Sequence, residues 1–332
     1  MRILFLAVVL AAVPQSRADV AVDGSFTLRS ARDSREVNLN LQYEDGRSNY
    51  GRNVDRSELS NVIPAADRIS FTLRRDPGTF TFEGRGTMER ASGWYDFVPN
   101  AEFQRGLEKI GFRDVDGKSL FVFALDGLTI EKVRQLQRLV SDTLDTDTLV
   151  RLINHGAGVE YIQAMTDIGF KNLSSGEYRR ARDHGVSADL AREMADLGMK
   201  LSLQELIRTR DHGVTTEYIQ AMRGAGYKLS HEELIRTRDH GVTVDFIRRM
   251  AQLGFGSLDI AEYVRMRDHG VTTDYVEAMR DAGYSRLTPQ ELVRLRDHGV
   301  TSSYVRRVRD MLKEAPSVEQ LIRMRNSGAF VR

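Results

Sequence analysis

A motif of arginine, aspartate, histidine, glycine and valine recurs along the second half of the chain. Its histidines step by 28, 28, 29 and 29 residues: His184, His212, His240, His269 and His298. A shared metal ion would need ligands within about 4 Å of it, whereas successive helical units lie about 10 Å apart. We therefore expect no metal site. The simpler interpretation is that each histidine lies in the last turn of a helix and bonds the free carbonyl groups there.

The negative charge of the aspartate before each histidine needs a positive partner, because an acid at a helix C-terminus opposes the helix dipole. The preceding arginine is the natural partner, and its apolar counterpart Ile153 in the first repeat suggests that its stem is partly buried. We predict a ladder in which these arginines pair with aspartates of the same or adjacent repeats: Arg182, Arg210, Arg238, Arg267 and Arg296. Such pairs would fix the register between repeats.

A second set of arginines lies two residues earlier in each repeat: Arg180, Arg208, Arg236, Arg265 and Arg294. Arginine suits bidentate recognition of carboxylates, so these five are candidate binding residues for an anionic partner such as a carboxylated peptide or a cell-wall polymer. The alternative is a solvated charged face, since acidic residues interleave with them.

The spacing of these motifs predicts an array of helical hairpins. In one unit, Ser202 and Glu205 form a capping box, Gly213 ends the first helix, and Thr215 begins the second. Each helix is too short to persist alone in water, so stacking must supply the stability. Six hairpins and a closing half are expected, beginning near Asp145, Ser174, Ser202, Ser230, Asp259, Thr288 and Ser317.

The first part of the chain has the pattern of a small antiparallel sheet. Apolar and polar residues alternate over 26–29, 37–43 and 69–74, the turn Asp76-Pro77-Gly78 leads into 79–83, and 93–98 is a further candidate strand. We expect a polar loop over 44–62, a strand over 120–125 and a helix over 128–139. The predicted fold class is α+β: a small β-rich domain with one helix, residues 19–127, followed by an α-solenoid, residues 128–332.

The N-terminus has the pattern of a signal peptide, residues 1–18. Arg2 precedes the short apolar run 3–13, and Ser16-Arg17-Ala18 is a small-x-small cleavage site. Cleavage would remove two of 48 basic residues, leaving 46 against 47 acidic ones, a balance that gives no attraction to nucleic acid. The chain has no cysteine, and no later segment is apolar for long enough to span a membrane. We expect a periplasmic or secreted bacterial protein.

No catalytic, cofactor-binding or metal motif is found in the sequence. The units, such as Leu234 to Thr243, resemble short helical repeats of bacterial exported proteins, also appended to membrane metallopeptidases of the beta-lactam-sensing type. The likeness covers about 128–332 and implies an extracytoplasmic module that binds or senses something. No peptidase residue carries over, because this chain has neither the zinc motif nor the transmembrane helices.

We therefore expect an exported, non-enzymatic scaffold that binds a protein or peptide in the cell envelope. One alternative is an envelope enzyme with its site near Tyr43, Glu44, Trp94 and Asp96. Another is a cell-wall glycan binder in which Trp94 and tyrosines of the sheet form the platform, although a lone tryptophan is more often a core residue. The oligomeric state is left open.

Overall fold

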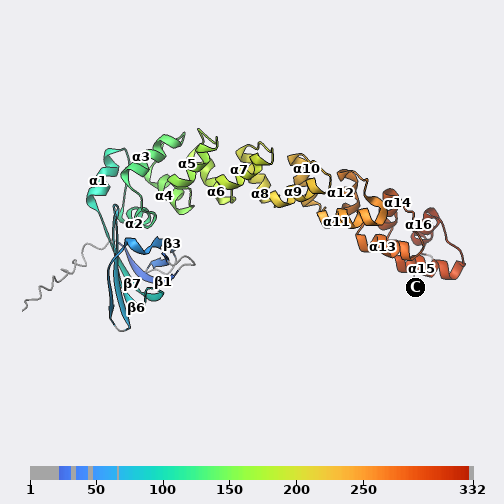
Figure 1. Cartoon of the computed structure of the whole chain (residues 1–332), viewed down its shortest axis with the longest axis horizontal. Helices are drawn as coiled ribbons and strands as arrows, with labels where there is room; N and C mark the ends of the chain where they lie inside the picture. Colours follow the sequence, from blue (N-terminus) through green and yellow to red (C-terminus); the bar gives the residue numbers. More distant parts are fainter. Residues whose placement is uncertain (1–21, 31–34, 44–47, 66, 329–332) are drawn as a thin grey trace, which may run out of the picture. The chain divides into compact units, whose positions relative to one another are not determined.

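The protein has an α+β fold, a seven-stranded antiparallel sheet followed by helices (Figure 1). The computed structural model describes residues 22–30, 35–43, 48–65 and 67–328. The chain divides into two compact units, Met1–Asp183 and His184–Arg332, a boundary that falls inside the predicted repeat region. The expected signal peptide, 1–18, lies outside the described residues. Within those residues, no helix is both long and apolar enough to cross a bilayer.

The sheet is built from strands that alternate inward apolar and outward polar residues, as β2 does with Val37, Leu39 and Leu41 buried. Its spatial order is β3-β2-β1-β7-β6-β5-β4. The five strands predicted before residue 100 and the turn at Asp76-Pro77-Gly78 are confirmed. The strands are β1 (Val22–Ser30), β2 (Glu36–Tyr43), β3 (Asn49–Asp55), β4 (Leu59–Ala65), β5 (Arg68–Arg75), β6 (Gly78–Gly86) and β7 (Arg90–Pro99).

The expectation of a polar loop over 44–62 is wrong. This stretch contains β3 and the start of β4, the two edge strands, joined by a 3-10 turn at Arg56–Glu58. In β3 only Val54 is fully buried, and β4 has an irregular register between Ser60 and Ile63. Edge strands of this kind are held by backbone pairing to one neighbour, so their sequence carries little apolar alternation.

The sheet curls tightly around its apolar face. Phe26 on β1 contacts Phe71 on β5 with ring centroids 5.5 Å apart, although two strands lie between them. In a flat sheet three strand spacings would separate them by about 14 Å. Gly93 opposes Gly84 on the inner face, where a Cβ on Gly93 would collide with the backbone of β6. These glycines leave room for the curl and for the phenylalanine core.

The predicted strand over 120–125 is a helix, α2 (Gly117–Asp126). Asp116 caps its start by accepting from the Ser119 amide, and Gly127 ends it in the left-handed conformation. All six residues from Leu120 to Leu125 are buried, so the run lacks the polar face that would have identified a helix. The ring of Phe121 enters the sheet's concave face, with its centroid 5.4 Å from that of Phe80 and 5.9 Å from that of Tyr95.

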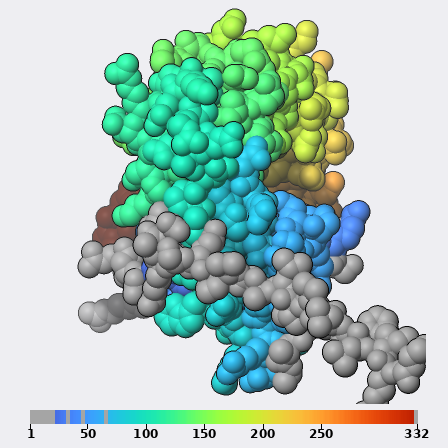
Figure 2. Space-filling view, turned by 90° about the vertical axis from the view of Figure 1, so that its left-hand side faces the viewer, coloured from blue at the N-terminus to red at the C-terminus, as the bar shows by residue number. Residues whose placement is uncertain are grey.

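Two more helices lie with α2 at one end of the sheet (Figure 1), where their residues form the teal-to-green surface above the blue of the first strands in the space-filling view (Figure 2). They are α1 (Ala101–Lys109) and α3 (Ile130–Leu139), which pack against each other. The described residues of the stretch 19–127 therefore include two α-helices, α1 and α2, where one was expected. The predicted helix over 128–139 is confirmed as α3.

The remaining helices form the expected succession of pairs, each starting at the predicted caps. The capping box at Ser202 and Glu205 is present, and Thr215 accepts from the amide of Tyr218. The pairs are α4 (Thr146–Asn154) with α5 (Val159–Asp167), α6 (Ser175–Asp183) with α7 (Ala188–Asp196), α8 (Leu203–Asp211) with α9 (Thr216–Gly224), α10 (His231–Asp239) with α11 (Val244–Met250, continued by a π-turn at Ala251–Phe255), α12 (Ile260–Asp268) with α13 (Thr273–Asp281), and α14 (Pro289–Asp297) with α15 (Ser302–Leu312). The unpaired α16 (Val318–Asn326) follows them.

Within the second compact unit, equivalent helices of successive pairs contact one another. First helices pack in the order α10, α12, α14 and α16, and second helices in the order α9, α11, α13 and α15 (Figure 1). Each row buries its own apolar residues, such as Leu234 and Val264 in the first and Ile219 and Val276 in the second. The helix pairs thus have a repeat-like arrangement.

Candidate functional site

The end of each first helix positions the recurring motif. In α8, Asp211 is the last helical residue, His212 is the C-cap, and Gly213 takes a φ of 64°, which favours glycine. The amide of Val214 then donates to the Thr209 carbonyl at 2.9 Å, and Val214 is buried. This predicted cap fixes the direction in which the aspartate and histidine leave the helix.

Each histidine reaches the aspartate of the next helix pair. The Nδ1–Oδ1 distance is 2.6 Å for His184 and Asp211 and 2.7 Å for His212 and Asp239. An ionised carboxylate only accepts hydrogen bonds, so Nδ1 carries the proton. The same bond joins His155 to Asp183, His240 to Asp268 and His269 to Asp297, and His298 ends the series on Asn326.

Two predictions about these residues are wrong. The histidine side chains bond neighbouring carboxylates rather than the free carbonyls of their own helices. The aspartates are compensated by histidine rather than by arginine, and in the described chain none of the five predicted ladder arginines forms an ion pair with an aspartate. The cause is the geometry between pairs, which brings residues 27 or 28 positions apart into contact.

The arginine of the motif lies instead over an aromatic ring of the preceding pair. The guanidinium carbon of Arg238 is 4.9 Å from the centroid of the Tyr218 ring, and that of Arg296 is 4.8 Å from Tyr275. Cation–π contacts of this type favour arginine because its planar group stacks on the ring. The others are Arg182 over Tyr161, Arg267 over Phe246 and Arg325 over Tyr304. In the repeat before Arg210, Leu190 occupies the position that the aromatic residue holds elsewhere.

We call the contact between two successive pairs the junction; it is formed by the histidine and aromatic residue of one pair and by the arginine and aspartate of the next. A third contact is made by the hydroxyl group where the aromatic residue is Tyr218 or Tyr275. The hydroxyl of Tyr218 donates to the Val242 carbonyl at 2.9 Å, and that of Tyr275 to the Val300 carbonyl at the same distance. Burial raises the pKa of Tyr275 to about 12, although Arg296 opposes the rise. The sequence does contain a signal from which this contact could have been predicted. An aromatic residue recurs five positions after the motif glycine.

The junctions hold pairs of ligating groups rather than clusters. Among the residues that the structure describes, no group of three histidine or carboxylate side chains is placed to hold a metal ion. The histidine and aspartate side chains are each 36–44% exposed, so the bonds lie at the surface of the helix rows. Their evident role is to connect successive pairs.

The structure separates the five candidate binding arginines into two kinds. Arg208 makes a bidentate pair with Glu232, at 2.5 and 2.9 Å, and Arg294 binds both carboxylate oxygens of Glu319. These hydrogen bonds hold the pKa of both glutamates below the ordinary value. Both arginines are therefore already paired within the chain.

Arg236 and Arg265 have no such partner. Ala261 and Gln290 occupy the positions that Glu232 and Glu319 hold in their own repeats. Within the described ranges the side chains of Arg236 and Arg265 make no hydrogen bond or ion pair, and both are exposed. Arg180, the fifth candidate, likewise has no described partner and belongs to the first compact unit. Arg236 and Arg265 are thus positive charges without a described partner, on two helices in contact, α10 and α12.

The region suggested for an enzyme site contains an open cavity of about 480 Å³ lined by Tyr43, Tyr50, Asp116 and Lys118. Burial raises the pKa of Tyr43 well above its ordinary value. Burial also acts to raise the pKa of Asp116, but the hydroxyl and amide of Ser119 bond to its carboxylate and keep that pKa low. Asp116 therefore serves as a helix cap in this cavity.

Trp94 and Asp96, also suggested for that site, lie on the opposite face of the sheet from Tyr43. Glu44 lies outside the described residues, and Trp94 and Asp96 project from β7 on the outer face of the sheet. The Trp94 side chain is not in the core, since the residue is 68% exposed.

A scan against models of known protein families finds no match, and a search of curated proteins finds none either. The resemblance to exported helical repeats stays a prediction.

Proposed function

We propose that the protein is an exported, non-enzymatic binding scaffold, in which the helix pairs are hairpins stacked as an α-solenoid. The solenoid would present its exposed helix face to a protein or peptide in the cell envelope. Export rests on the N-terminal sequence, with its short apolar run and small-x-small site.

Recurrence of the junction supports the solenoid. Helices of about nine residues are marginal in isolation, and the junction between the third and fourth pairs joins them by three kinds of contact. An array of this type has stability through nearest neighbours and an extended surface that can be varied without disturbing the core.

The observation that carries the binding function is the break in arginine–glutamate pairing at Arg236 and Arg265. A guanidinium with no internal partner is available for a carboxylate of another molecule. Packed helices lie 8–10 Å apart, and an extended peptide in the polyproline II conformation advances about 9 Å over three residues, which return the side chain to the same face. We infer that the partner carries acidic side chains three positions apart in an extended segment.

An array of synthetic peptides tests this inference. Twelve-residue Gly/Ser peptides carry two glutamates separated by one to five positions, and binding is measured by fluorescence polarisation at low salt. The expected optimum is a separation of three, with about tenfold weaker binding by the double variant R236Q/R265Q, because two charge-assisted contacts are lost.

Matched controls distinguish the effect of Arg236 and Arg265 from the effect of positive charge in general. R208Q should leave binding unchanged, because Arg208 is already paired with Glu232. The substitution A261E should weaken binding, because it would give Arg236 an internal partner. Equal binding at all separations, or equal loss in R208Q and R236Q/R265Q, would contradict the proposal.

A further inference from the structure

The outer face of the sheet carries an exposed indole among polar side chains. Trp94 lies directly opposite Ser25 on β1 and Glu83 on β6, and makes no contact with another ring in the described chain. Its neighbours on the same face of β7 are Ser92 and Asp96, both exposed. An indole left in water on the middle strand of a sheet is a surface available for contact with another molecule.

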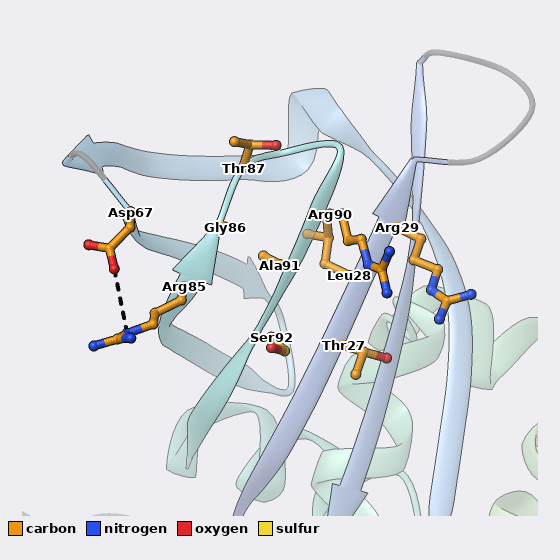
Figure 3. Close-up of a pocket in the computed structure, with 10 residues that line it drawn as sticks. All are labelled: Thr27, Leu28, Arg29, Asp67, Arg85, Gly86, Thr87, Arg90, Ala91 and Ser92. Carbon is orange, nitrogen blue, oxygen red and sulfur yellow. Dashed lines mark ion pairs between the residues drawn. The ribbon is translucent and has the colours of Figure 1, made fainter.

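Two arginines face each other farther along the same strands. Arg29 on β1 and Arg90 on β7 are direct cross-strand partners. Like charges in this position repel each other and destabilise a sheet. Figure 3 shows the two side chains projecting side by side, with Arg85 on the other side of an open hollow of about 530 Å³. The hydroxyls of Thr27 and Ser92 also line this hollow.

The described carboxylates nearest the hollow, including Asp67 in its lining, are paired with arginines other than Arg29 and Arg90. Asp67 lies 3.7 Å from Arg85, and Glu89 lies 3.7 Å from Arg56 while it accepts from the Thr87 hydroxyl. No described acidic side chain is paired with Arg29 or Arg90. The repulsion between these two arginines is therefore uncompensated in the part of the chain that the structure covers.

We propose that this face binds an acidic glycan, with a neutral sugar ring stacked on Trp94 and a carboxylate between Arg29 and Arg90. Glu83 and Asp96, beside the indole, would accept hydrogen bonds from the hydroxyls of the neutral ring. Trp94 lies four positions from Arg90 along β7, about 13 Å, so the ligand must extend over more than one ring. Neutral and acidic units must therefore follow each other along the chain of sugars.

The position of these residues in the sheet favours a glycan over a peptide. Strands β1, β7 and β6 are interior strands whose backbone groups are paired on both sides. A peptide cannot add to them as a further strand, which is the mode that gives extended peptides most of their affinity for sheets. Recognition must use side chains alone: one stacking surface, hydroxyls, carboxylates and guanidinium groups.

The fluorescence of Trp94 gives a direct test, since it is the only tryptophan in the chain. Titration of the whole protein with hyaluronan hexasaccharide, in which N-acetylglucosamine alternates with glucuronate, should shift and strengthen the indole emission. The neutral chitohexaose should bind at least about tenfold more weakly, because it lacks the carboxylates. Added salt should weaken only the binding of the acidic oligosaccharide.

Three variants locate the site. R29Q/R90Q should lose at least about tenfold in affinity for the hyaluronan hexasaccharide, and W94A should lose a similar factor as measured by calorimetry. R74Q changes an exposed arginine of β5 and should bind as the parent does. No change in Trp94 emission with the acidic probe, equal affinity for chitohexaose, or full affinity in R29Q/R90Q would overturn the proposal.

Discussion

Asp239 shows what one side chain contributes to a junction. It accepts from His212 of the preceding pair, but it also lies at the C-terminus of α10, where its charge opposes the helix dipole. We expect D239A to lower the free energy of unfolding by about 0.5 kcal/mol, since the half-exposed bond is screened by solvent. D239N should lower the free energy of unfolding by less, because the side-chain amide oxygen of Asn326 already serves as the acceptor for His298.

Asp196 is the matched control for this prediction. It ends α7 as Asp239 ends α10, and it has no hydrogen bond or ion pair among the described residues. D196A should therefore leave stability unchanged or raise it slightly, through relief of the dipole alone. Urea denaturation of the two alanine variants compares them. Identical changes in the two would mean that the histidine bond contributes nothing.

The sequence identified the motif residues but not their partners. It correctly placed His212 at a helix end and Gly213 in the left-handed conformation. It could not show that His212 meets Asp239, because that contact depends on the rotation between successive pairs. For the same reason the arginines were predicted to pair with aspartates, whereas Arg238 stacks on Tyr218. The difference between Arg208 and Arg236, by contrast, is readable from the glutamate or alanine in the following repeat.

The capping boxes make the helix pairs sensitive to acid. Hydrogen bonds from Ser202 and Ser230 lower the pKa of Glu205 and Glu233 below the ordinary value of 4.5. A group with a lowered folded-state pKa contributes stability above its unfolded-state pKa and loses that contribution as the pH falls through the folded value. Stability should therefore decline as the pH falls below about 4.5.

Glutamine variants test the source of this decline. In the last box the amide oxygen of Gln320 accepts from the Ser317 backbone at 2.7 Å, so glutamine keeps the cap without a titrating group. E205Q/E233Q should have nearly the parent's stability at pH 6 and a shallower decline towards pH 3, measured by urea denaturation. An unchanged slope would assign the acid sensitivity to other carboxylates.

Helices with an amphipathic stripe and caps were predictable, and buried or edge elements were not. The pairs from α4 to α15 begin at the expected caps because each has its own start and stop residues. The apolar run Leu120 to Leu125 gives no periodicity, since this part of α2 is buried on all sides. The strands β3 and β4 lack alternation because they are edges. In both cases the deciding contacts come from distant parts of the chain.

The account as a whole depends on the helix pairs having little stability apart from their neighbours. Their helices are short, their apolar faces are covered by the equivalent helices of adjacent pairs, and the junctions add polar contacts. The sequence period alone predicts this dependence, and the contacts within the second compact unit support it.

Hydrogen exchange in a weakened junction is the most direct test. D239A combined with Y218F removes the histidine bond and the Tyr218 hydroxyl bond between the third and fourth pairs. Exchange should accelerate in α8 to α11, on both sides of the junction, less in α14 to α16, and not in the sheet. Acceleration confined to α10 alone, with α8 and α9 at parent rates, would contradict the mutual dependence of the pairs.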